Sequence, residues 1–200
     1  MNDWKAMYQE KRKTPEEVAK LFHAGDICLS NGQITEPIAI LHALADRAER
    51  EGLTGIRHYL LLPMRNQKYM AAGMEAHIRH VSHFVSGFDR EAIWEGRSDY
   101  LPSHYSQVPV LWKQVLEGPD VFYCTVSPMD RHGYFSCGTA ADLSEIRKKA
   151  GRLFLEGNPC RAPSAATSTS RKWMRWWKAT CPSPRCPPPP SARTTRSSAA

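Results

Sequence analysis

The chain has 200 residues, of which 42% are hydrophobic and 24% charged, and its formal net charge is +7. This length suffices for one domain with a hydrophobic core, and without a signal peptide or the roughly 18 consecutive apolar residues of a transmembrane helix we expect a soluble, cytoplasmic protein that makes no membrane contact. Because eight of the 27 Lys and Arg residues lie in the last 41 positions, which contain no Asp or Glu, residues 1–159 carry a net charge of −1 and do not predict a nucleic-acid surface.

The first half of the chain predicts alternating helices and strands. Thr14–Glu17 has the residues of a capping box, with proline at the first helical position, and predicts a helix that continues to about His23. Ile27–Ser30 is a short apolar run typical of a buried strand. An amphipathic helix is predicted at Pro37–Glu51 and a further strand at Gly55–Leu62. A strand, a helix and a strand within about 35 residues indicate an α/β fold with a parallel sheet.

The second half continues this alternation. The predicted elements are an extended segment at His80–Gly87, short helices at Asp89–Gly96 and Val108–Leu116, a strong strand at Asp120–Val126, a helix at Ala140–Ala150 and a strand at Arg152–Leu155. A loop at Ser127–Gly138 separates the strong strand from the helix after it. The pattern predicts one α/β domain over residues 1–158.

Two loops that follow predicted strands are candidate substrate-binding segments, because open α/β sheets bind ligands at the carboxyl ends of their strands. His132 could transfer a proton, although a loop histidine near an aspartate is more often a hydrogen-bonded structural residue. Neither loop contains a GxGxxG or GxxxxGK[ST] motif, so a nucleotide cradle is not predicted. The candidates are Ser30, Asn31, Gly32, Glu36 and Pro37 on the first loop, and Ser127, Pro128, Asp130, His132 and Gly133 on the second.

Histidines at i, i+3 and i+6 raise the question of a metal site. On a helix, His77 and His83 would diverge by about 120°, and on a strand His80 would face away from both. We therefore predict no metal site, and expect these histidines to be exposed or to line a pocket. The three cysteines before the last 41 residues are scattered, without a CxxC motif, and are expected to be reduced thiols.

The tail, residues 159–200, has a different composition from the rest. From Cys160 onward it lacks Ile, Leu, Val, Phe, Tyr, Asp and Glu, so it cannot offset the cost of ordering its backbone and is predicted to be disordered. Plausible GC-rich codons for residues 160–169, read from their third base, encode Pro-Arg-Thr-Phe-Gly-Gly-Asn-Val-His. Continued along the tail, this shifted frame encodes a normal mixture of acidic and aliphatic residues. The single codons of Trp and Met make Trp173–Met174 and Trp176–Lys178 yield Asp, Val and Glu in that frame. We hypothesise a frameshift between about Glu156 and Cys160, which the coding DNA would settle.

Several short stretches resemble one family when taken in order. They are Trp4, Tyr8, Lys11, Thr14–Glu17, Gly25-Asp26, Glu36-Pro37, Phe84, Arg90, Gly96–Pro102 and Ser127–Phe135. Together they resemble the N-terminal lobe of the acetyl-CoA hydrolase/transferase family, which includes 4-hydroxybutyrate and butyryl-CoA:acetate CoA-transferases. The resemblance covers residues 4 to about 159. The translation of the tail in the shifted frame, continued as Ile-Ser-Glu-Val-Asp, resembles the sequence that follows this lobe in the family.

The resemblance implies two stacked α/β lobes and a glutamate that attacks an acyl-CoA, forming an anhydride and then a glutamyl-CoA thioester. In the family this glutamate and the glycine-rich CoA-binding segment belong to the C-terminal lobe. The resemblance therefore implies no catalytic residue in this chain, and at most a substrate-lining role for the ten candidates. Coenzyme A enters as a thioester substrate and not as a bound cofactor. The intact parent protein is expected to be a homo-oligomer.

The resemblance favours a truncated CoA-transferase whose parent exchanges CoA between an acyl-CoA and a small carboxylate such as acetate, butyrate or 4-hydroxybutyrate. The alternative within the family is acyl-CoA hydrolysis. A non-enzyme alternative is an α/β domain whose basic, Trp- and Pro-rich tail binds nucleic acid or an SH3-like partner. We do not expect nucleic acid as a partner, because the basic residues of the tail follow no repeated pattern. The 200-residue chain alone is expected to be inactive and poorly soluble.

Overall fold

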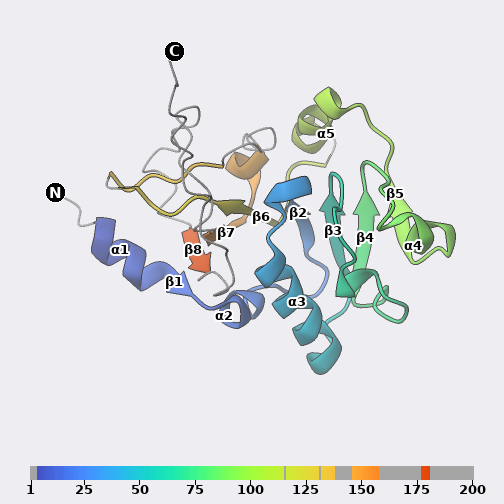
Figure 1. Cartoon of the computed structure of the whole chain (residues 1–200), viewed down its shortest axis with the longest axis horizontal. Helices are drawn as coiled ribbons and strands as arrows, with labels where there is room; N and C mark the ends of the chain where they lie inside the picture. The colour runs from blue at the N-terminus through green and yellow to red at the C-terminus, as the bar shows by residue number, and fades with distance from the viewer. Residues whose placement is uncertain (1–3, 115, 131, 138–145, 158–176, 181–200) are drawn as a thin grey trace, which may run out of the picture.

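The computed structural model describes residues 4–114, 116–130, 132–137, 146–157 and 177–180. The described residues form one parallel sheet of eight strands in the order β1-β8-β7-β6-β2-β3-β4-β5 (Figure 1). This confirms the predicted α/β fold with a parallel sheet. The strands are β1 Arg12–Lys13, β2 Ile27–Ser30, β3 Ile56–Leu60, β4 Ile78–Ser82, β5 Ser98–Tyr100, β6 Val121–Val126, β7 Arg152–Gly157 and β8 Trp177–Thr180.

Helices cover both faces of the sheet. The α-helices are α1 Trp4–Lys11, α2 Pro15–Ala19, α3 Ile38–Glu51, α4 Arg90–Trp94 and α5 Val108–Gln114. Short 3₁₀ turns are η1 Gln33–Thr35, η2 Lys68–Met70, η3 Tyr105–Gln107 and η4 Ile146–Lys149. Strand β6 is buried throughout, with Tyr123 in the apolar cluster under α2 and α3, and Phe122 in the cluster under α5. Burial on both faces explains why this strand reads as a continuous apolar run and not as an alternating one.

The chain builds the sheet outward from β2 in two directions. After β2 it adds β3, β4 and β5 on one side, and it then returns to add β6 and β7 on the other. The two directions separate between β2 and β6, which pair in parallel with Ser30 opposite Tyr123. Such a switch point is where open α/β sheets bind ligands, outside the carboxyl ends of the strands.

The sequence located most of these elements. Strand β2 has its predicted bounds, and strands β3, β6 and β7 and helices α3, α4 and α5 lie within two residues of theirs, while β4 begins two residues before its predicted start and ends at Ser82. Helix α2 is shorter than predicted and ends at Ala19. Helix α1 and the three-residue edge strand β5 were not predicted. Of the predicted helix at Ala140–Ala150, residues 140–145 lie outside the described residues, and η4 covers Ile146–Lys149.

Four residues of the tail differ from the predicted disorder. Trp177–Thr180 form β8, which pairs in parallel with β7 and with β1. Pairing through backbone hydrogen bonds does not require aliphatic side chains, and this explains how a segment without them joins the sheet. The remainder of the tail, residues 158–176 and 181–200, lies outside the described residues.

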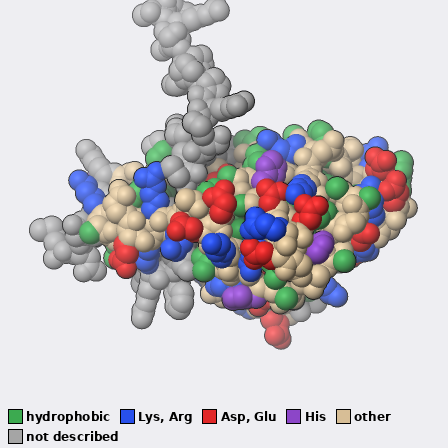
Figure 2. Space-filling model, turned by 90° about the horizontal axis from the view of Figure 1, so that it is seen from below, with side chains coloured by type: hydrophobic (Ala, Val, Ile, Leu, Met, Phe, Trp, Pro, Cys, Tyr) green, Lys and Arg blue, Asp and Glu red, His purple; other side chains and the backbone are tan. Residues whose placement is uncertain are grey.

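Acidic and basic side chains are interspersed over the face of the molecule seen from below in Figure 2. This agrees with a net charge of −1 for residues 1–159. The described part of this face therefore lacks the uniformly basic surface that phosphate binding favours. Also within the described residues, no helix is both long and apolar enough to cross a membrane. The cysteines Cys28, Cys124 and Cys137 are buried and form no disulfide in the described part of the chain.

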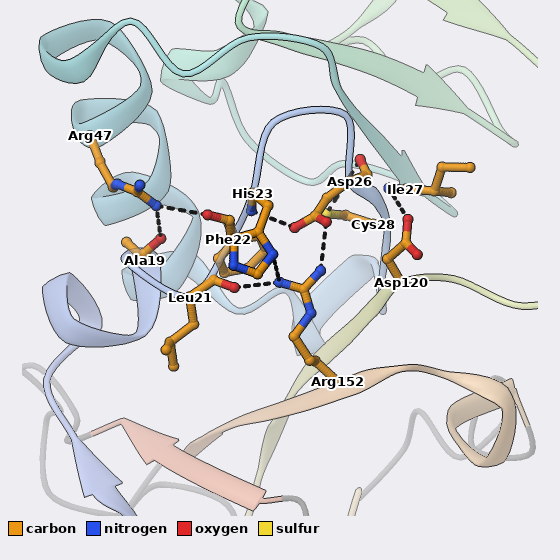
Figure 3. Close-up of polar contacts among 10 residues, drawn as sticks. All are labelled: Ala19, Leu21, Phe22, His23, Asp26, Ile27, Cys28, Arg47, Asp120 and Arg152. Atoms are coloured by element: carbon orange, nitrogen blue, oxygen red, sulfur yellow. Dashed lines mark hydrogen bonds and ion pairs between the residues drawn. The ribbon is translucent and has the colours of Figure 1, made fainter.

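A polar network fixes the amino ends of three central strands, where Arg152 at the start of β7 lies beside the chain between α2 and β2 (Figure 3). Its guanidinium donates to Leu21 O and lies 2.5 Å from Asp26 Oδ1. The other oxygen of Asp26 accepts from His23 N at 2.7 Å. At the start of β6, Asp120 Oδ2 accepts from Ile27 N at 2.8 Å. The network therefore joins β2, β6 and β7, the strands around the switch point.

We expect Asp26→Ala to destabilise the fold by about 2–3 kcal/mol, because it leaves a half-buried guanidinium and a backbone amide without their acceptor. The Asp26 side chain is 8% exposed, so water restores little of this loss. The matched control is Asp46→Ala, which removes a surface ion pair between Lys68 and a carboxylate that is 59% exposed. The control is expected to cost less than about 1 kcal/mol. Urea denaturation followed by far-UV circular dichroism measures both, and equal losses would contradict the role of Asp26.

Candidate functional site

Both candidate loops begin at the switch point of the sheet. Ser30 ends β2, Ser127 follows β6, and these two strands are neighbours. The first loop packs against the residues that follow β3, because Gln33 N donates to Leu62 O at 2.9 Å. A Cβ on Gly32 would lie 2.8 Å from the backbone nitrogen of Leu62, so this close approach requires glycine. The loop after β2 thus lies between the ends of β3 and β6.

Glu36 is the most unusual residue of the first loop. It is 3% exposed and directly precedes Pro37, which is the N-cap of α3. Its backbone carbonyl accepts a hydrogen bond from Thr125 Oγ1 of β6 at 3.0 Å, which ties the first loop to the strand before the second. The amino end of α3 is already capped by another carboxylate, since Glu156 Oε2 accepts from Ile40 N at 3.0 Å. The backbone nitrogen of Ile40 therefore donates to Glu156 and not to the carboxyl group of Glu36.

The carboxyl group of Glu36 has no hydrogen-bond partner of regular geometry among the described residues. Its Oε2 lies 3.8 Å from Arg65 Nε, and the Arg65 side chain is 51% exposed. Burial raises the pKa of Glu36 to about 7, while the nearby amide of Gln67 and the guanidinium of Arg65 oppose the rise and Glu156 adds to it. A carboxylic acid at this position is thus partly protonated near neutral pH.

A buried polar layer lies beneath this edge of the sheet. Ser30 Oγ is 2.9 Å from His58 Nε2, and the ring of His58 lies 4.8 Å from that of Tyr69. Further along, His80 Nε2 is 3.3 Å from Asp89 Oδ2. Burial lowers the pKa of His58 well below its usual value, and the neighbouring His80 adds to this effect. The layer therefore holds His58 neutral and in contact with Ser30 at the start of the site.

The second loop is organised mainly by its own hydrogen bonds. Asp130 Oδ1 accepts from the backbone nitrogens of His132 and Tyr134, both at 2.8 Å, and Asp130 O accepts from Gly133 N. Ser127 Oγ donates to Pro128 O. Gly133 has a φ of 84°, which favours glycine at this turn. Asp130 thus shapes the loop, and His132 is exposed.

The three spaced histidines differ from the expectation that they are exposed or line a pocket. His80 and His83 are fully buried, and His77 is half-buried with Nδ1 2.8 Å from Leu53 O. They lie on and around β4, whose alternating faces separate them. Within the described residues, no group of three or more His, Cys, Asp or Glu side chains is arranged to hold a metal ion.

Sequence reasoning missed the residues that surround Glu36. Gln67 is 4% exposed and lies in the loop after β3, and both polar atoms of its side chain lack a partner in the described structure. Tyr69 lies in η2, and burial and the charge of Glu36 raise the pKa of its hydroxyl well above the usual value. The signal that could have identified Arg65 and Gln67 is their position in a polar loop after a predicted strand. They follow β3 in the same way that the first loop follows β2.

We expect Glu36→Gln to stabilise the fold at alkaline pH and to leave it unchanged in acid. The folded-state pKa of about 7 lies above the ordinary 4.5, so Glu36 favours the folded state fully below pH 4.5, and this benefit is lost as the pH rises through 7. The difference between glutamine and glutamate therefore grows to about 3 kcal/mol above pH 8.

Urea denaturation at pH 5 and at pH 8.5 tests this difference. Glu49→Gln is the control, because Glu49 also lies on α3 but its side chain is 60% exposed. The control should shift stability equally at both pH values. If Glu36→Gln also shifts stability equally at both pH values, the buried, partly protonated carboxyl group of Glu36 is refuted.

Comparisons with known proteins identify the domain. Residues 1–158 match the family model described as acetyl-CoA hydrolase/transferase N-terminal domain. The 4-hydroxybutyrate coenzyme A transferase of Clostridium kluyveri is 29% identical over 76% of the chain, and the butyryl-CoA:acetate CoA-transferase of Anaerostipes caccae is 32% identical over 78%. The crystal structure of RipA from Yersinia pestis superimposes with a TM-score of 0.78 and 30% identity, covering 93% of this chain and 47% of RipA.

The chain spans only 35% of the length of each of these two CoA-transferases. The similarity nevertheless extends over strands β1 to β7, both candidate loops and the residues around Glu36, all of which lie within the matched region. The chain therefore belongs to the acetyl-CoA hydrolase/transferase family, of which residues 1–158 form the N-terminal domain.

Proposed function

We propose that the intact protein transfers CoA between an acyl-CoA and a small carboxylate such as acetate, butyrate or 4-hydroxybutyrate, and that residues 1–158 line the substrate side of its site. The observation that carries this proposal is the position of Ser30–Pro37 and Ser127–Gly133 at the switch point of a sheet that belongs to this family. The CoA-transferases named above support transfer as the reaction.

The reaction needs a carboxylate nucleophile that this chain does not supply. In the proposed mechanism a glutamate of the C-terminal lobe attacks the thioester carbonyl and releases the CoA thiolate, which then attacks the resulting anhydride to give glutamyl-CoA and the free acyl carboxylate. The acceptor carboxylate then attacks glutamyl-CoA and releases the CoA thiolate, and the thiolate attacks the new anhydride to give the product acyl-CoA and the free glutamate. The ten candidate residues of the present domain position the acyl group and the acceptor, and none of them forms a covalent bond.

A product assay on the frame-restored protein tests the proposal. The protein is supplied with butyryl-CoA and acetate, and CoA species are separated by chromatography. Transfer predicts that acetyl-CoA and butyrate form in equal amounts, while total thioester stays constant. Free CoA that accumulates without acetyl-CoA would favour the hydrolase, the other activity in the family name. Neither product at any acyl chain length would refute both. The intact protein is further expected to be a cytoplasmic homo-oligomer.

A further inference from the structure

We propose that Arg65, Gln67 and Glu36 form a binding site for the carboxylate group of a small carboxylic acid. Under the proposed function this acid is the acceptor of CoA, and to that extent the inference rests on the proposed function. The three residues lie on the loops after β2 and β3, which are adjacent parallel strands. Their carboxyl ends meet at one edge of the sheet, beside the switch point.

The two loops are held together by their backbones. Gln33 N donates to Leu62 O at 2.9 Å, and the missing side chain of Gly32 allows the loops to approach. This brings Glu36 Oε2 to 3.8 Å from Arg65 Nε. The amide of Gln67 is close enough to lower the pKa of Glu36. The three side chains therefore converge although they are up to 31 positions apart in the sequence.

Arg65 is positioned to bind an anion rather than to stabilise the fold. Its separation of 3.8 Å from Glu36 exceeds hydrogen-bond distance, and within the described structure no hydrogen bond is recorded for its guanidinium. Other arginines differ: Arg47, Arg79 and Arg152 donate to Glu51, Asp99 and Asp26 at 2.5–2.9 Å. A half-exposed guanidinium with its donors uncommitted suits bidentate binding of a carboxylate.

Gln67 and Glu36 supply the second, independent observation. Both are more than nine-tenths buried, and four of their polar atoms, Gln67 Oε1 and Nε2 and Glu36 Oε1 and Oε2, lack hydrogen-bond partners of regular geometry among the described residues, although the two side chains lie close to each other. Buried polar atoms are nearly always satisfied in folded proteins. A carboxylate ligand would accept from Gln67 Nε2, from the Arg65 guanidinium and from the O–H of protonated Glu36, so one ligand engages a donor of each of the three residues.

This arrangement makes binding depend on pH. Above pH 7 the ionised Glu36 repels a second carboxylate and competes with it for Arg65. The other groups facing Glu36 are Glu156 of β7, which favours its protonated form, and the hydroxyls of Tyr69 and Tyr123, whose own pKa values are raised by burial. Affinity for a carboxylate is therefore expected to fall about tenfold between pH 6 and pH 8.5.

Binding of ¹³C-labelled acetate to the 200-residue chain tests the site directly, because ligand relaxation can be measured at low protein concentration. Butyrate extends the test to a longer acid, and acetamide is the neutral isostere. Arg65→Ala is expected to weaken acetate binding about tenfold or more, since it removes a charge-assisted pair of hydrogen bonds. Glu36→Gln should retain binding at pH 6 and lose the dependence on pH.

Arg50→Ala is the matched control, because Arg50 is also exposed but lies in the last turn of α3, paired with Glu51. It should bind acetate as the parent chain does. Equal acetate binding by Arg65→Ala, or equal binding of acetamide and acetate, would overturn the proposal. Thermal melts identify any variant that fails to fold. If Glu36→Gln fails to fold, Arg65→Ala still tests the site, because the Arg65 side chain is half-exposed. The assay requires no nucleophile, so it can fail or succeed independently of CoA transfer.

Discussion

Restoring the reading frame that we hypothesise to be lost between about Glu156 and Cys160 is expected to produce CoA-transferase activity that the 200-residue chain lacks. The 200-residue chain should give the rate of a nucleophile-free control, whereas the restored protein should exceed the uncatalysed rate by a factor of about 10⁶ or more. The physical reason is that covalent exchange between two acids proceeds through a glutamate which, by the family resemblance, belongs to the missing lobe. The measurement is acetyl-CoA formation from butyryl-CoA and acetate at equal protein concentration.

A chain ending at Gly157 is the control for the tail itself. If residues 160–200 only replace the missing lobe, this shortened chain should be as inactive as the 200-residue protein. Adding CoA or butyryl-CoA should rescue neither. Transfer by either truncated chain above the control would show that the nucleophile lies within residues 1–157, and it would refute the assignment of these residues to substrate binding alone.

Trp112→Ala is expected to destabilise the domain by about 3–5 kcal/mol, a large share of the stability of a typical domain. Trp112 lies on α5, is fully buried and meets the ring of Tyr59 edge-on at 4.9 Å. Its indole nitrogen also donates to His83 Nε2 at 3.4 Å. Truncation would leave a cavity between α5 and the sheet and remove this donor.

Trp94→Ala provides the matched control, because Trp94 lies at the end of α4 and is 79% exposed. The same truncation there is expected to change stability by no more than about 0.5 kcal/mol. Urea denaturation followed by far-UV circular dichroism compares the two variants without relying on tryptophan fluorescence. Similar losses at both positions would contradict the packing of α5 described above.

The sequence predicted the elements whose signals are local. Ile27–Ser30 and Val121–Val126 are continuous apolar runs, as strands buried on both faces require, and α3 has one apolar face. Edge elements have weaker signals. Strand β5 has only three residues and two of them are exposed, so nothing apolar marks it. Where helix α2 ends, Arg47 binds the carbonyls of Ala19 and Phe22, a tertiary contact that capping residues do not reveal.

The candidate site was predictable in position but not in composition. The loops after β2 and β6 could be placed at one edge because the alternation of helices and strands predicts parallel strands, whose carboxyl ends lie at the same edge of the sheet. The burial of Glu36 depends on Thr125, Pro37 and the approach of the β3 loop, none of which is close in sequence to the others. Arg65 and Gln67 became candidates only when β3 was seen beside β2. By contrast, Asp130 makes its hydrogen bonds within its own loop, to the backbone nitrogens of His132 and Tyr134. This local contact agrees with the interpretation of His132 as a hydrogen-bonded structural residue.

The pairing of β7 with β8 has a consequence for assembly. Main-chain hydrogen bonding is indifferent to sequence, so the outer edge of β7 can recruit any extended segment that reaches it, including Trp177–Thr180. A strand from a second molecule that displaced β8 would satisfy the same donors and acceptors of β7. Self-association of the 200-residue chain would then proceed by addition of strands at this edge, and blocking the edge of β7 would keep the chains apart without any change to the site around Glu36.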